Sequence, residues 1–356
     1  MLGCLKNNNG NNRYGGAEKS LIHLANWLAS KGIEIVLASV EGDVKAFSVA
    51  KNVKFVGYKV DSGLSKIRKH LKIRKNTIEV INEERPDLVI GFWIYPLFYG
   101  VNVMKRNKIP YIYSLRNDPS REYSLIAKYV MRFVINNAAY VVFQTKDAAS
   151  YFGECIKNKS SVIHNPTYIK DGDYTSAIKS NKIVTIGRLE KQKNQKILID
   201  AFCRIKDQLK NTSLEIYGEG SLKGYLESYI NERGISDSVK LMGTYPDVLK
   251  RIQGAKLFVL PSLYEGMPNV LIEAMCIGVP VLSSDCPCGG PREIIKDGEN
   301  GFLFKNNDID DLVNKMMEIL KQENNDRIIE NAKKMIETHS EEVIFSKWEK
   351  IIKKLR

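Results

Sequence analysis

The fold is indicated by the stretch Leu257-Phe-Val-Leu260-Pro-Ser-Leu-Tyr-Glu265-Gly-Met-Pro-Asn269-Val-Leu-Ile-Glu273. Its four apolar residues at the start predict a short buried strand. Met267-Pro268 predicts the start of a helix, because proline suits a first turn. Glu265 then lies in the loop after the strand, and Glu273 lies about two turns inside the helix. Since open α/β sheets bind ligands outside the carboxyl ends of their strands, both glutamates are candidates for a binding site.

The predicted helix start also offers backbone amides to an anion. We expect the amides of Asn269, Val270 and Leu271 to be free and to point into the crevice, where they would meet phosphate oxygens. The vicinal hydroxyls of ribose or hexose suit ionised carboxylates, which are pure acceptors. An anion site flanked by two carboxylates therefore predicts a sugar nucleotide as the ligand.

A second strand with a polar loop lies upstream, in Ile183-Val-Thr-Ile-Gly187-Arg188-Leu-Glu-Lys-Gln-Lys193-Asn194. Arginine offers a planar fork of donors and lysine a compact point charge. Together they could neutralise a diphosphate leaving group as the bond to it breaks. We therefore predict that Arg188 and Lys193 bind a diphosphate, although either one alone could be an ordinary surface cation.

Two glycine-containing turns are further candidates for donor binding. Gly15 and Gly16 end an asparagine-rich loop and open a helix, and paired glycines permit close approach of the backbone to a ligand. Gly218 follows the predicted strand 214–217. It begins a segment close to the dinucleotide fingerprint Gly-x-Gly-x-x-Gly, but the third glycine of that pattern comes one position late, at Gly224. We interpret Gly218 as part of a strand-to-helix turn at the donor site.

In their order along the chain, these motifs resemble glycosyltransferase family 4, the retaining GT-B enzymes that build bacterial surface polysaccharides such as O-antigen and capsule. The resemblance covers nearly the whole chain. It includes the Glu-x7-Glu pair, the Gly-Arg-Leu-x-x-x-Lys-Asn segment at 187–194, Gly289-Gly-Pro-Arg-Glu293 and Asp297-Gly-x-Asn-Gly301. It implies that Glu265 lies beside the donor hexose, that Glu273 binds the nucleotide ribose, and that the Arg/Lys pair holds the diphosphate. A Glu-x7-Glu spacing alone is common on solvated helix faces, so the joint occurrence carries the argument.

The resemblance implies a function. We expect retaining transfer of a hexose or N-acetylhexosamine from a UDP-sugar to a polyprenyl-diphosphate-linked saccharide, with Glu265, Arg188 and Lys193 as the catalytic residues. The resemblance implies that no cofactor or metal is needed. Two alternatives stay open. A GT-B sugar-nucleotide epimerase would share the donor site and need no acceptor, and a non-catalytic nucleotide-sugar-binding subunit would keep the fold without catalysis.

Apolar runs alternate with helical patterns along the rest of the chain, which predicts parallel sheets covered by helices. The predicted strands are 34–39, 87–92, 109–114 and 139–143 in the first half, and lie near Ile183, Leu214, Val239, Leu257, Val281 and Gly301 in the second. With 356 residues and 44% hydrophobic composition, the chain is long enough for two domains. The predicted fold class is α/β, and the resemblance implies GT-B, with two Rossmann-like domains facing across a cleft.

Four segments are predicted along the chain. Residues 1–166 form the acceptor-binding domain, and 167–181 form a linker, because this stretch is polar and poor in core residues. Residues 182–338 form the nucleotide-sugar-binding domain. Residues 339–356 contain an amphipathic helix that, by the resemblance, packs back on the first domain.

Two features depart from the family pattern. Only Met1–Leu5 precedes the first loop, a shorter first strand than usual, which is compatible with a start further upstream. Arg116 lies at a strand end where many relatives carry a histidine near the reacting centre. We treat Arg116 as a candidate on the acceptor side, although it could equally be structural through Asp118.

The charge is concentrated in the first half. Residues 1–166 carry 25 of the 54 Lys and Arg but only 13 of the 41 Asp and Glu. Within them, Leu64, Ile67 and Leu71 form an apolar stripe among the cations of 66–75, the pattern of a helix on an anionic membrane. A core-facing stripe with a solvated basic face is our preferred interpretation of the stripe itself. The charge excess still favours a polyanionic neighbour, and we expect a cytoplasmic protein, peripheral on the cytoplasmic face of the inner membrane.

Other classes are disfavoured by the sequence. No zinc spacing, RNA-binding aromatic signature or helix-turn-helix pattern accompanies the basic residues, so no nucleic-acid partner is predicted. The uncharged run 88–104 is at the lower limit for a membrane span, and we interpret it as a buried strand followed by a helix. No secretory signal is visible, and the six cysteines show no metal-ligand spacing, so reduced thiols are expected.

Overall fold

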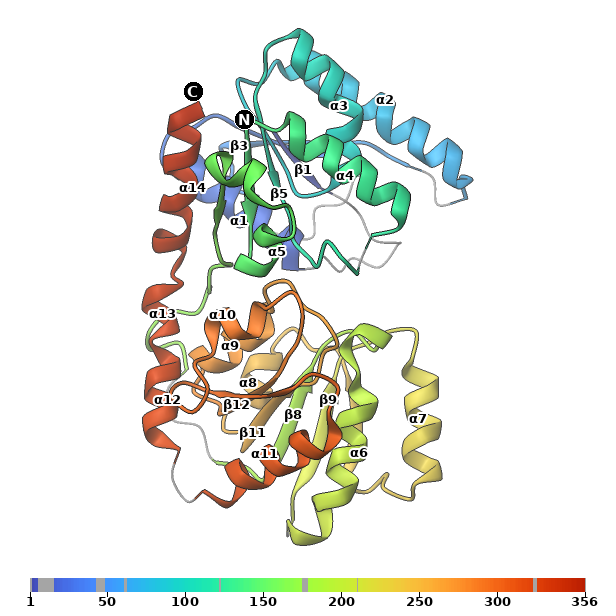
Figure 1. The fold of residues 1–356 in the computed structure, drawn as a ribbon, viewed down its shortest axis with the longest axis vertical. Coiled ribbons are helices and arrows are strands. Elements are labelled where there is room, and N and C mark those ends of the chain that lie inside the picture. The colour runs from blue at the N-terminus through green and yellow to red at the C-terminus, as the bar shows by residue number, and fades with distance from the viewer. Residues whose placement is uncertain are drawn as a thin grey trace. The chain divides into compact units, whose positions relative to one another are not determined.

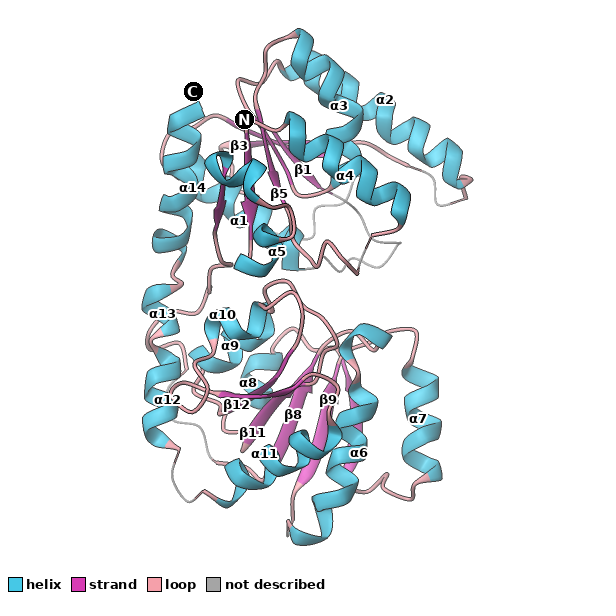
Figure 2. Cartoon of the chain, in the orientation of Figure 1, coloured by secondary structure: helices cyan, strands magenta, loops and turns pink. Residues whose placement is uncertain are grey.

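The computed structural model describes residues 2–5, 16–42, 49–60, 63–121, 123–174, 179–209, 211–322 and 325–355. The chain divides into two compact units. Unit 1 consists of residues 1–166 and 342–356, and unit 2 of residues 167–341. Each unit contains one sheet with helices packed against it (Figures 1 and 2).

Unit 1 is built on a seven-stranded parallel sheet in the order β3-β2-β1-β4-β5-β6-β7. The strands are β1 (Leu2–Leu5), β2 (Ile35–Ser39), β3 (Val53–Gly57), β4 (Val89–Gly91), β5 (Tyr111–Ser114), β6 (Tyr140–Phe143) and β7 (Ser160–Val162). The strand order reverses between β1 and β4. That reversal is the topological switch point, where open α/β sheets leave a crevice for ligands.

The helices of unit 1 are α1 (Gly16–Ser30), α2 (Lys66–Glu84), α3 (Ile94–Arg106), α4 (Leu125–Asn137), α5 (Lys146–Ser150) and most of α14 (Glu341–Leu355). The run 88–104 is β4 followed by α3, as predicted. Ser65 and Ser124 cap α2 and α4 by accepting backbone amides three residues ahead. Among the described residues, none of the helices combines the length and apolarity that a bilayer span requires.

The C-terminal helix α14 packs within unit 1. Its buried residues include Phe345 and Trp348, whose rings lie 5.8 Å from Trp27 and 6.1 Å from Phe92 between centroids. The Trp27 indole also donates to Glu342 (3.1 Å). Each large apolar side chain buried in this way contributes about 1.5–3 kcal/mol. The last segment of the chain therefore contributes to the core of unit 1, the unit that also contains the N-terminal half of the chain.

Helix α2 exposes the apolar stripe that the sequence places among its cations. Ile67 is 75% exposed and Leu71 57%. The preferred interpretation of this stripe as core-facing is therefore wrong. The helix packs against α3 along a different face, formed by Ile73, Asn76, Thr77, Val80 and Ile81.

Unit 2 is built on a six-stranded parallel sheet in the order β10-β9-β8-β11-β12-β13. The strands are β8 (Lys182–Ile186), β9 (Ser213–Tyr217), β10 (Val239–Gly243), β11 (Leu257–Leu260), β12 (Val281–Asp285) and β13 (Phe302–Lys305). The order reverses between β8 and β11, which is the switch point of this sheet.

The helices of unit 2 are α6 (Gln195–Ile205), α7 (Lys223–Glu232), α8 (Val248–Ile252), α9 (Asn269–Cys276), α10 (Gly290–Ile294), α11 (Ile309–Lys321), α12 (Asp326–Lys333) and α13 (Met335–Thr338). They cover both faces of the sheet, because successive strand residues point to opposite sides. Leu257 and Val259 belong to the core cluster under α6 and α11, whereas Phe258 and Leu260 belong to the cluster under α9.

The segment predicted as a linker, 167–181, belongs by its contacts to unit 2. The Thr167 amide donates to the His339 carbonyl (2.7 Å), and Ile169 is buried in the core cluster under α9. A polar composition is compatible with this packing because one well-placed apolar residue anchors the segment.

Candidate functional site

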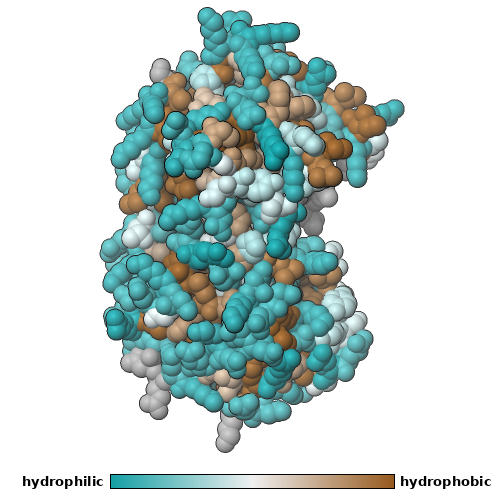
Figure 3. All heavy atoms as spheres, in the orientation of Figure 1, coloured by the Kyte–Doolittle hydropathy of each residue, from teal (hydrophilic) through white to brown (hydrophobic). Residues whose placement is uncertain are grey.

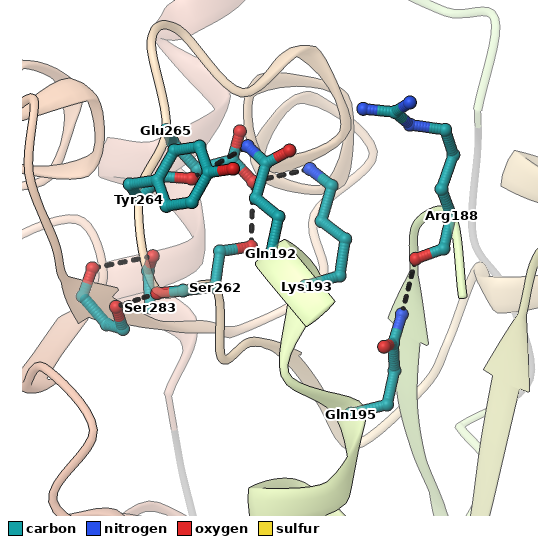
Figure 4. A network of polar contacts seen from close by, with 9 residues as sticks. Arg188, Gln192, Lys193, Gln195, Ser262, Tyr264, Glu265 and Ser283 are labelled. Atoms are coloured by element: carbon teal, nitrogen blue, oxygen red, sulfur yellow. Dashed lines mark hydrogen bonds and ion pairs between the residues drawn. The ribbon is translucent and has the colours of Figure 1, made fainter. Parts of the chain in front are cut away.

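The two polar loops singled out in the sequence follow the two strands that flank the switch point of unit 2. Gly187–Asn194 comes after β8 and Pro261–Pro268 comes after β11. Lys193 and Glu265 are 72 positions apart, and the Lys193 ammonium donates to Glu265 Oε1 (Figure 4). Their side chains are 15% and 8% exposed, so the ion pair is largely withdrawn from water. The fold therefore joins two of the three predicted catalytic residues into one contact.

Glu265 is held by further contacts. The Ser262 hydroxyl donates to Oε1 (2.7 Å), and the Ser284 hydroxyl donates to the Ser262 carbonyl (2.6 Å). The Glu265 amide donates to the Pro287 carbonyl (2.7 Å), and the Glu265 carbonyl accepts the amide of Cys288 (2.9 Å). The carboxylate is therefore oriented before any ligand arrives.

The electrostatic environment of Glu265 extends to a buried thiol. Burial, and secondarily the Glu265 charge, raise the pKa of Cys286 to about 12. Cys286 is fully buried at the end of β12. The thiol is therefore neutral and adds no negative charge near Glu265. The charge of the Glu265 carboxylate is balanced by the Lys193 ammonium.

The loop carrying Lys193 is joined to the loop carrying Glu265. The Gln192 side-chain amide donates to the Tyr264 carbonyl (2.9 Å), and the Leu263 amide donates to the Gln192 carbonyl (2.8 Å). The stem of Lys193 lies over Gly187, where an added Cβ would be 3.3 Å from the lysine Cγ and Cδ. These contacts fix where the ammonium points.

Arg188 differs from Lys193 in that its side chain is exposed. Its carbonyl accepts the Gln195 side-chain amide (2.8 Å), which fixes the backbone of the turn. In Figure 4 the guanidinium extends toward the same side as the Lys193 ammonium. Within the described part of the chain, the guanidinium forms no hydrogen bond or ion pair. Its donors are therefore available to a ligand at the strand ends.

Gly218 has a clear packing role. Its φ is +143°, and a Cβ placed there would lie 2.0 Å from the Gly187 carbonyl oxygen. The Gly187 amide donates to the Tyr217 carbonyl (2.9 Å), so the ends of β8 and β9 meet backbone to backbone. The protein itself uses the space that a side chain at Gly218 would fill. Its predicted contact with the donor stays a prediction, and the close approach positions the turn that carries Arg188.

One of the three backbone amides predicted to be free at the start of α9 is bonded within the protein. Pro268 precedes the helix, which begins at Asn269, and the Leu271 amide donates to the Pro268 carbonyl (3.1 Å). The prediction of a free amide is therefore wrong for Leu271, because the first helical turn closes on Pro268. The Val270 amide has no acceptor among the described residues. Glu273 lies one turn further on and is partly buried.

The comparisons with known proteins identify the family of this chain. The family model described as "Glycosyltransferase Family 4" matches residues 14–169, and that described as "Glycosyl transferases group 1" matches residues 170–335. This chain belongs to glycosyltransferase family 4. An uncharacterized glycosyltransferase of Methanocaldococcus jannaschii is 32% identical over 254 residues, which cover 63% of this chain and 62% of that protein.

One relative of this glycosyltransferase and one solved structure match nearly the whole chain. An N-acetyl-D-galactosaminyltransferase of Campylobacter jejuni is 27% identical over 356 residues, or 96% of each protein. The crystal structure of HepE from Anabaena superposes with a TM-score of 0.81 at 18% identity, covering 99% of this chain and 100% of that one. The fold is therefore that of the GT-B glycosyltransferases.

Arg116 of the glycosyltransferase lies after β5 in unit 1 and is engaged by its neighbours. Its Nη1 donates to Asn165 Oδ1 (2.7 Å), and its guanidinium carbon lies 3.6 Å from the Phe92 ring centroid and 6.0 Å from that of Trp348. Asp118, the partner proposed from the sequence, accepts the Ser120 amide and hydroxyl on Oδ1. Arg116 thus links the strand ends of unit 1 to α14, and an acceptor role for it stays a prediction.

The glycines predicted at the first loop are only partly described. Gly15 lies outside the described residues. Gly16 is the first residue of α1 and is exposed. Within the described residues, no group of three or more His, Cys, Asp and Glu side chains converges as a metal site would require.

The sequence reasoning missed Ser262 and Gln192. Ser262 precedes Glu265 by three residues in the same loop, and Gln192 directly precedes Lys193. Short polar side chains next to a candidate charged residue, at the end of a buried strand, were the available signal. Their role is to hold Glu265 and its loop in place, as the contacts of both residues show.

Proposed function

We propose that this glycosyltransferase transfers a hexose or N-acetylhexosamine from a UDP-sugar to a saccharide carried on a polyprenyl diphosphate. The product would be part of an O-antigen or capsular polysaccharide, and the configuration at the anomeric carbon would be retained. The observation that carries the proposal is the Lys193–Glu265 pair at the switch point of unit 2, with the exposed Arg188 on the same loop as Lys193.

The proposed chemistry follows from where charge develops. As the glycosidic bond to the nucleotide breaks, the leaving diphosphate gains negative charge and the sugar ring becomes positive. The Lys193 ammonium has three protons, and Glu265 accepts one of them. The other two ammonium protons of Lys193 and the guanidinium donors of Arg188 remain for the phosphate oxygens. The protein holds these donors in place before the reaction begins.

Glu265 acts on the donor sugar, on the other side of the glycosidic bond that breaks. Its Oε2 is left for hydroxyls of the donor sugar, because Lys193 and Ser262 both donate to Oε1. A negative charge at that position also stabilises a positively charged sugar ring. We propose that Arg188 and Lys193 together supply the positive charge that the leaving group needs, so that the reaction is independent of metal ions.

The relatives support the choice of substrates. The Campylobacter jejuni protein is named for transfer of N-acetyl-D-galactosamine to GalNAc-alpha-(1->4)-GalNAc-alpha-(1->3)-diNAcBac-PP-undecaprenol, which is a saccharide on a polyprenyl diphosphate. HepE of Anabaena, which shares the fold, was solved with UDP and glucose. UDP-sugars and lipid-diphosphate saccharides are therefore the first substrates to test.

A lipid-linked acceptor requires access to a membrane, and one surface of unit 1 has the chemistry for it. Leu125, Ile126 and Tyr129 on α4 are 73–77% exposed, and Ile67 and Leu71 are exposed on α2. Figure 3 shows apolar groups over the ends of α2 and α4. The same two helices carry the exposed cations Lys66, Arg68, Lys72, Arg74, Lys75 and Arg132.

We propose that this α2–α4 surface rests on the anionic cytoplasmic leaflet of the inner membrane. Each basic residue near such a surface contributes about 1 kcal/mol, and the apolar residues add burial in the lipid. Flotation with vesicles of phosphatidylglycerol and phosphatidylethanolamine tests this. Replacing Leu125 and Ile126 by serine should reduce the bound fraction, whereas Tyr225→Ser, an exposed apolar residue of unit 2, should not. Equal binding of both variants would contradict the proposal.

Activity is tested by UDP release from a panel of UDP-sugars, with and without a polyprenyl-diphosphate disaccharide, in the presence of EDTA. Wild type is compared with Lys193→Ala and with Lys191→Ala, which removes an exposed lysine from the same short turn. Acceptor-dependent release that only Lys193→Ala abolishes is expected. Conversion of one UDP-sugar into another without acceptor would instead identify an epimerase. Binding of UDP-sugar without any turnover would identify a binding subunit.

A further inference from the structure

A second cluster of functional side chains lies in unit 1, away from the residues discussed so far. Glu41 follows β2, and its side chain is only 9% exposed. Oε1 lies 3.8 Å from the Lys69 ammonium on α2, which is a weak contact. Oε2 is buried and accepts no hydrogen bond from any described residue. A buried carboxylate oxygen without a donor is unfavourable, so the structure leaves an acceptor that a ligand could satisfy.

Three ring side chains on α2 and α3 contact one another, and one of them, Tyr99, lies within electrostatic range of Glu41. His70 Nδ1 is hydrogen-bonded to the Tyr99 hydroxyl (2.6 Å), and the His70 ring meets Tyr95 edge to face at 4.8 Å between centroids. Tyr95 and Tyr99 are stacked, with their centroids 6.4 Å apart. Burial raises the pKa of Tyr99, the neighbouring Tyr95 and Glu41 add to that effect, and Arg74 opposes it. Tyr99 therefore stays a neutral phenol within electrostatic range of Glu41.

The position of the cluster in the fold is that of a binding site. The strand order of unit 1 reverses between β1 and β4. Glu41 comes after β2, the neighbour of β1, and Tyr95 lies in the first turn of α3, directly after β4. The carboxyl ends of parallel strands meet at one edge of the sheet, so Glu41 and Tyr95 follow strands on either side of the switch point, where such sheets bind ligands. Unit 2 places Lys193 and Glu265 at the equivalent point of its own sheet.

The chemistry of the cluster suits a neutral saccharide. Aromatic faces accept the apolar C–H surface of a sugar ring, and a carboxylate oxygen accepts its hydroxyls. The second ring nitrogen of His70 is not bonded to any described residue and provides one more polar contact. A phosphate group would be repelled by Glu41 at close range. The residues thus favour a sugar over the diphosphate of a lipid-linked substrate.

We propose that Glu41, His70, Tyr95 and Tyr99 form the subsite for the sugar of the acceptor that receives the transferred residue, with Glu41 Oε2 accepting its hydroxyls. This inference rests on the proposed function, because an acceptor is needed only by a transferase. Glu41 then determines acceptor specificity and does not contact the donor.

The test compares Glu41→Gln with Glu83→Gln, a control that removes an exposed carboxylate from α2. Glu41→Gln should lower kcat/KM for the acceptor about 10- to 100-fold, as expected for loss of charge-assisted hydrogen bonds. The KM for the UDP-sugar and the affinity for UDP should not change. Tyr99→Phe, which keeps the ring but removes the hydroxyl, should give a smaller loss of the same kind. An unchanged acceptor kcat/KM in Glu41→Gln, or weaker UDP binding, would overturn the assignment.

A direct binding measurement separates this inference from the proposed function. Saturation-transfer NMR is recorded with the methyl α-glycosides of glucose, galactose, N-acetylglucosamine and N-acetylgalactosamine, on wild type, Glu41→Gln and Glu83→Gln. A signal that only Glu41→Gln loses supports the subsite even if no transfer is ever observed. A signal that survives in Glu41→Gln, or no signal with any glycoside, rejects the subsite even if the enzyme is an active transferase.

Discussion

Replacing Lys193 by methionine leaves the Glu265 carboxylate buried without its cation. In the wild type the two side chains are 15% and 8% exposed and bonded to each other. Methionine keeps most of the length of the lysine stem, so the contact with Gly187 is retained while the charge is lost. The substitution therefore isolates the ion pair from the packing around it.

The expected size of the effect follows from the burial of the pair. Removing one partner of a buried ion pair typically costs about 3–5 kcal/mol, because an uncompensated charge remains. We expect the lower end, about 3 kcal/mol, since the Ser262 hydroxyl still donates to Glu265. For a domain of about 150–250 residues this corresponds to a fall in Tm of about 6–12 °C. The double variant Lys193→Met/Glu265→Gln, which removes the stranded charge, should recover most of that loss.

The assay can resolve the two units. All three tryptophans, Trp27, Trp93 and Trp348, lie in unit 1, so tryptophan fluorescence reports on unit 1 alone. Urea unfolding followed by far-UV circular dichroism reports on both units. Lys193→Met should shift part of the circular dichroism transition to lower urea and leave the fluorescence transition unchanged. If Lys193→Met unfolds at the same urea concentration as the control Lys191→Met, the reasoning about the buried pair is refuted.

Three other predictions concern the same unit. Arg188→Ala should lower kcat/KM for the UDP-sugar about 100-fold with no change in urea unfolding, because the side chain is exposed and its proposed partner is the diphosphate of the donor; a similar loss in Lys191→Ala would show that the effect is not specific. Gly218→Ala should destabilise unit 2 by about 2 kcal/mol or more in the same urea assay and weaken UDP binding, since its Cβ would meet a carbonyl oxygen at 2.0 Å. A fully stable Gly218→Ala variant would contradict this packing argument. At pH 8, iodoacetamide should modify exposed Cys155 rapidly and leave Cys286 unmodified in the native protein, because burial raises the pKa of Cys286 to about 12 and its thiolate is scarce below that pH. Mass spectrometry should detect Cys286 labelling only as urea unfolds unit 2, and rapid labelling of the native protein would be the contrary result.

Much of the architecture could be predicted from local patterns. Short β-branched and apolar runs bounded by glycine or proline predict strands such as 183–186 and 257–260, and both are strands in the structure. A parallel sheet buries both faces, so these runs are continuously apolar and are easy to recognise. The loops after the strands then follow as candidate binding segments, which is how Arg188, Lys193 and Glu265 were selected.

Other features depend on contacts that local patterns do not contain. The sequence shows apolar stripes on α2 but not which one meets α3, and the structure buries Val80 and Ile81 while Ile67 stays exposed. The amide of Leu271 is used by the first helical turn, a matter of local capping geometry that composition does not specify. The packing role of Gly218 depends on how closely β8 and β9 approach at their ends.

The sequence alone therefore determined which residues are chemically equipped for a sugar nucleotide and on which strand ends they lie. The tertiary structure decided which of them meet. Lys193 and Glu265 are 72 residues apart and come together because β8 and β11 are neighbours in the sheet. Glu41 is a parallel case, since only the strand order of unit 1 brings the end of β2 to the same edge of the sheet as the end of β4. Strand order is set by packing between distant segments, and no local pattern of residues records it.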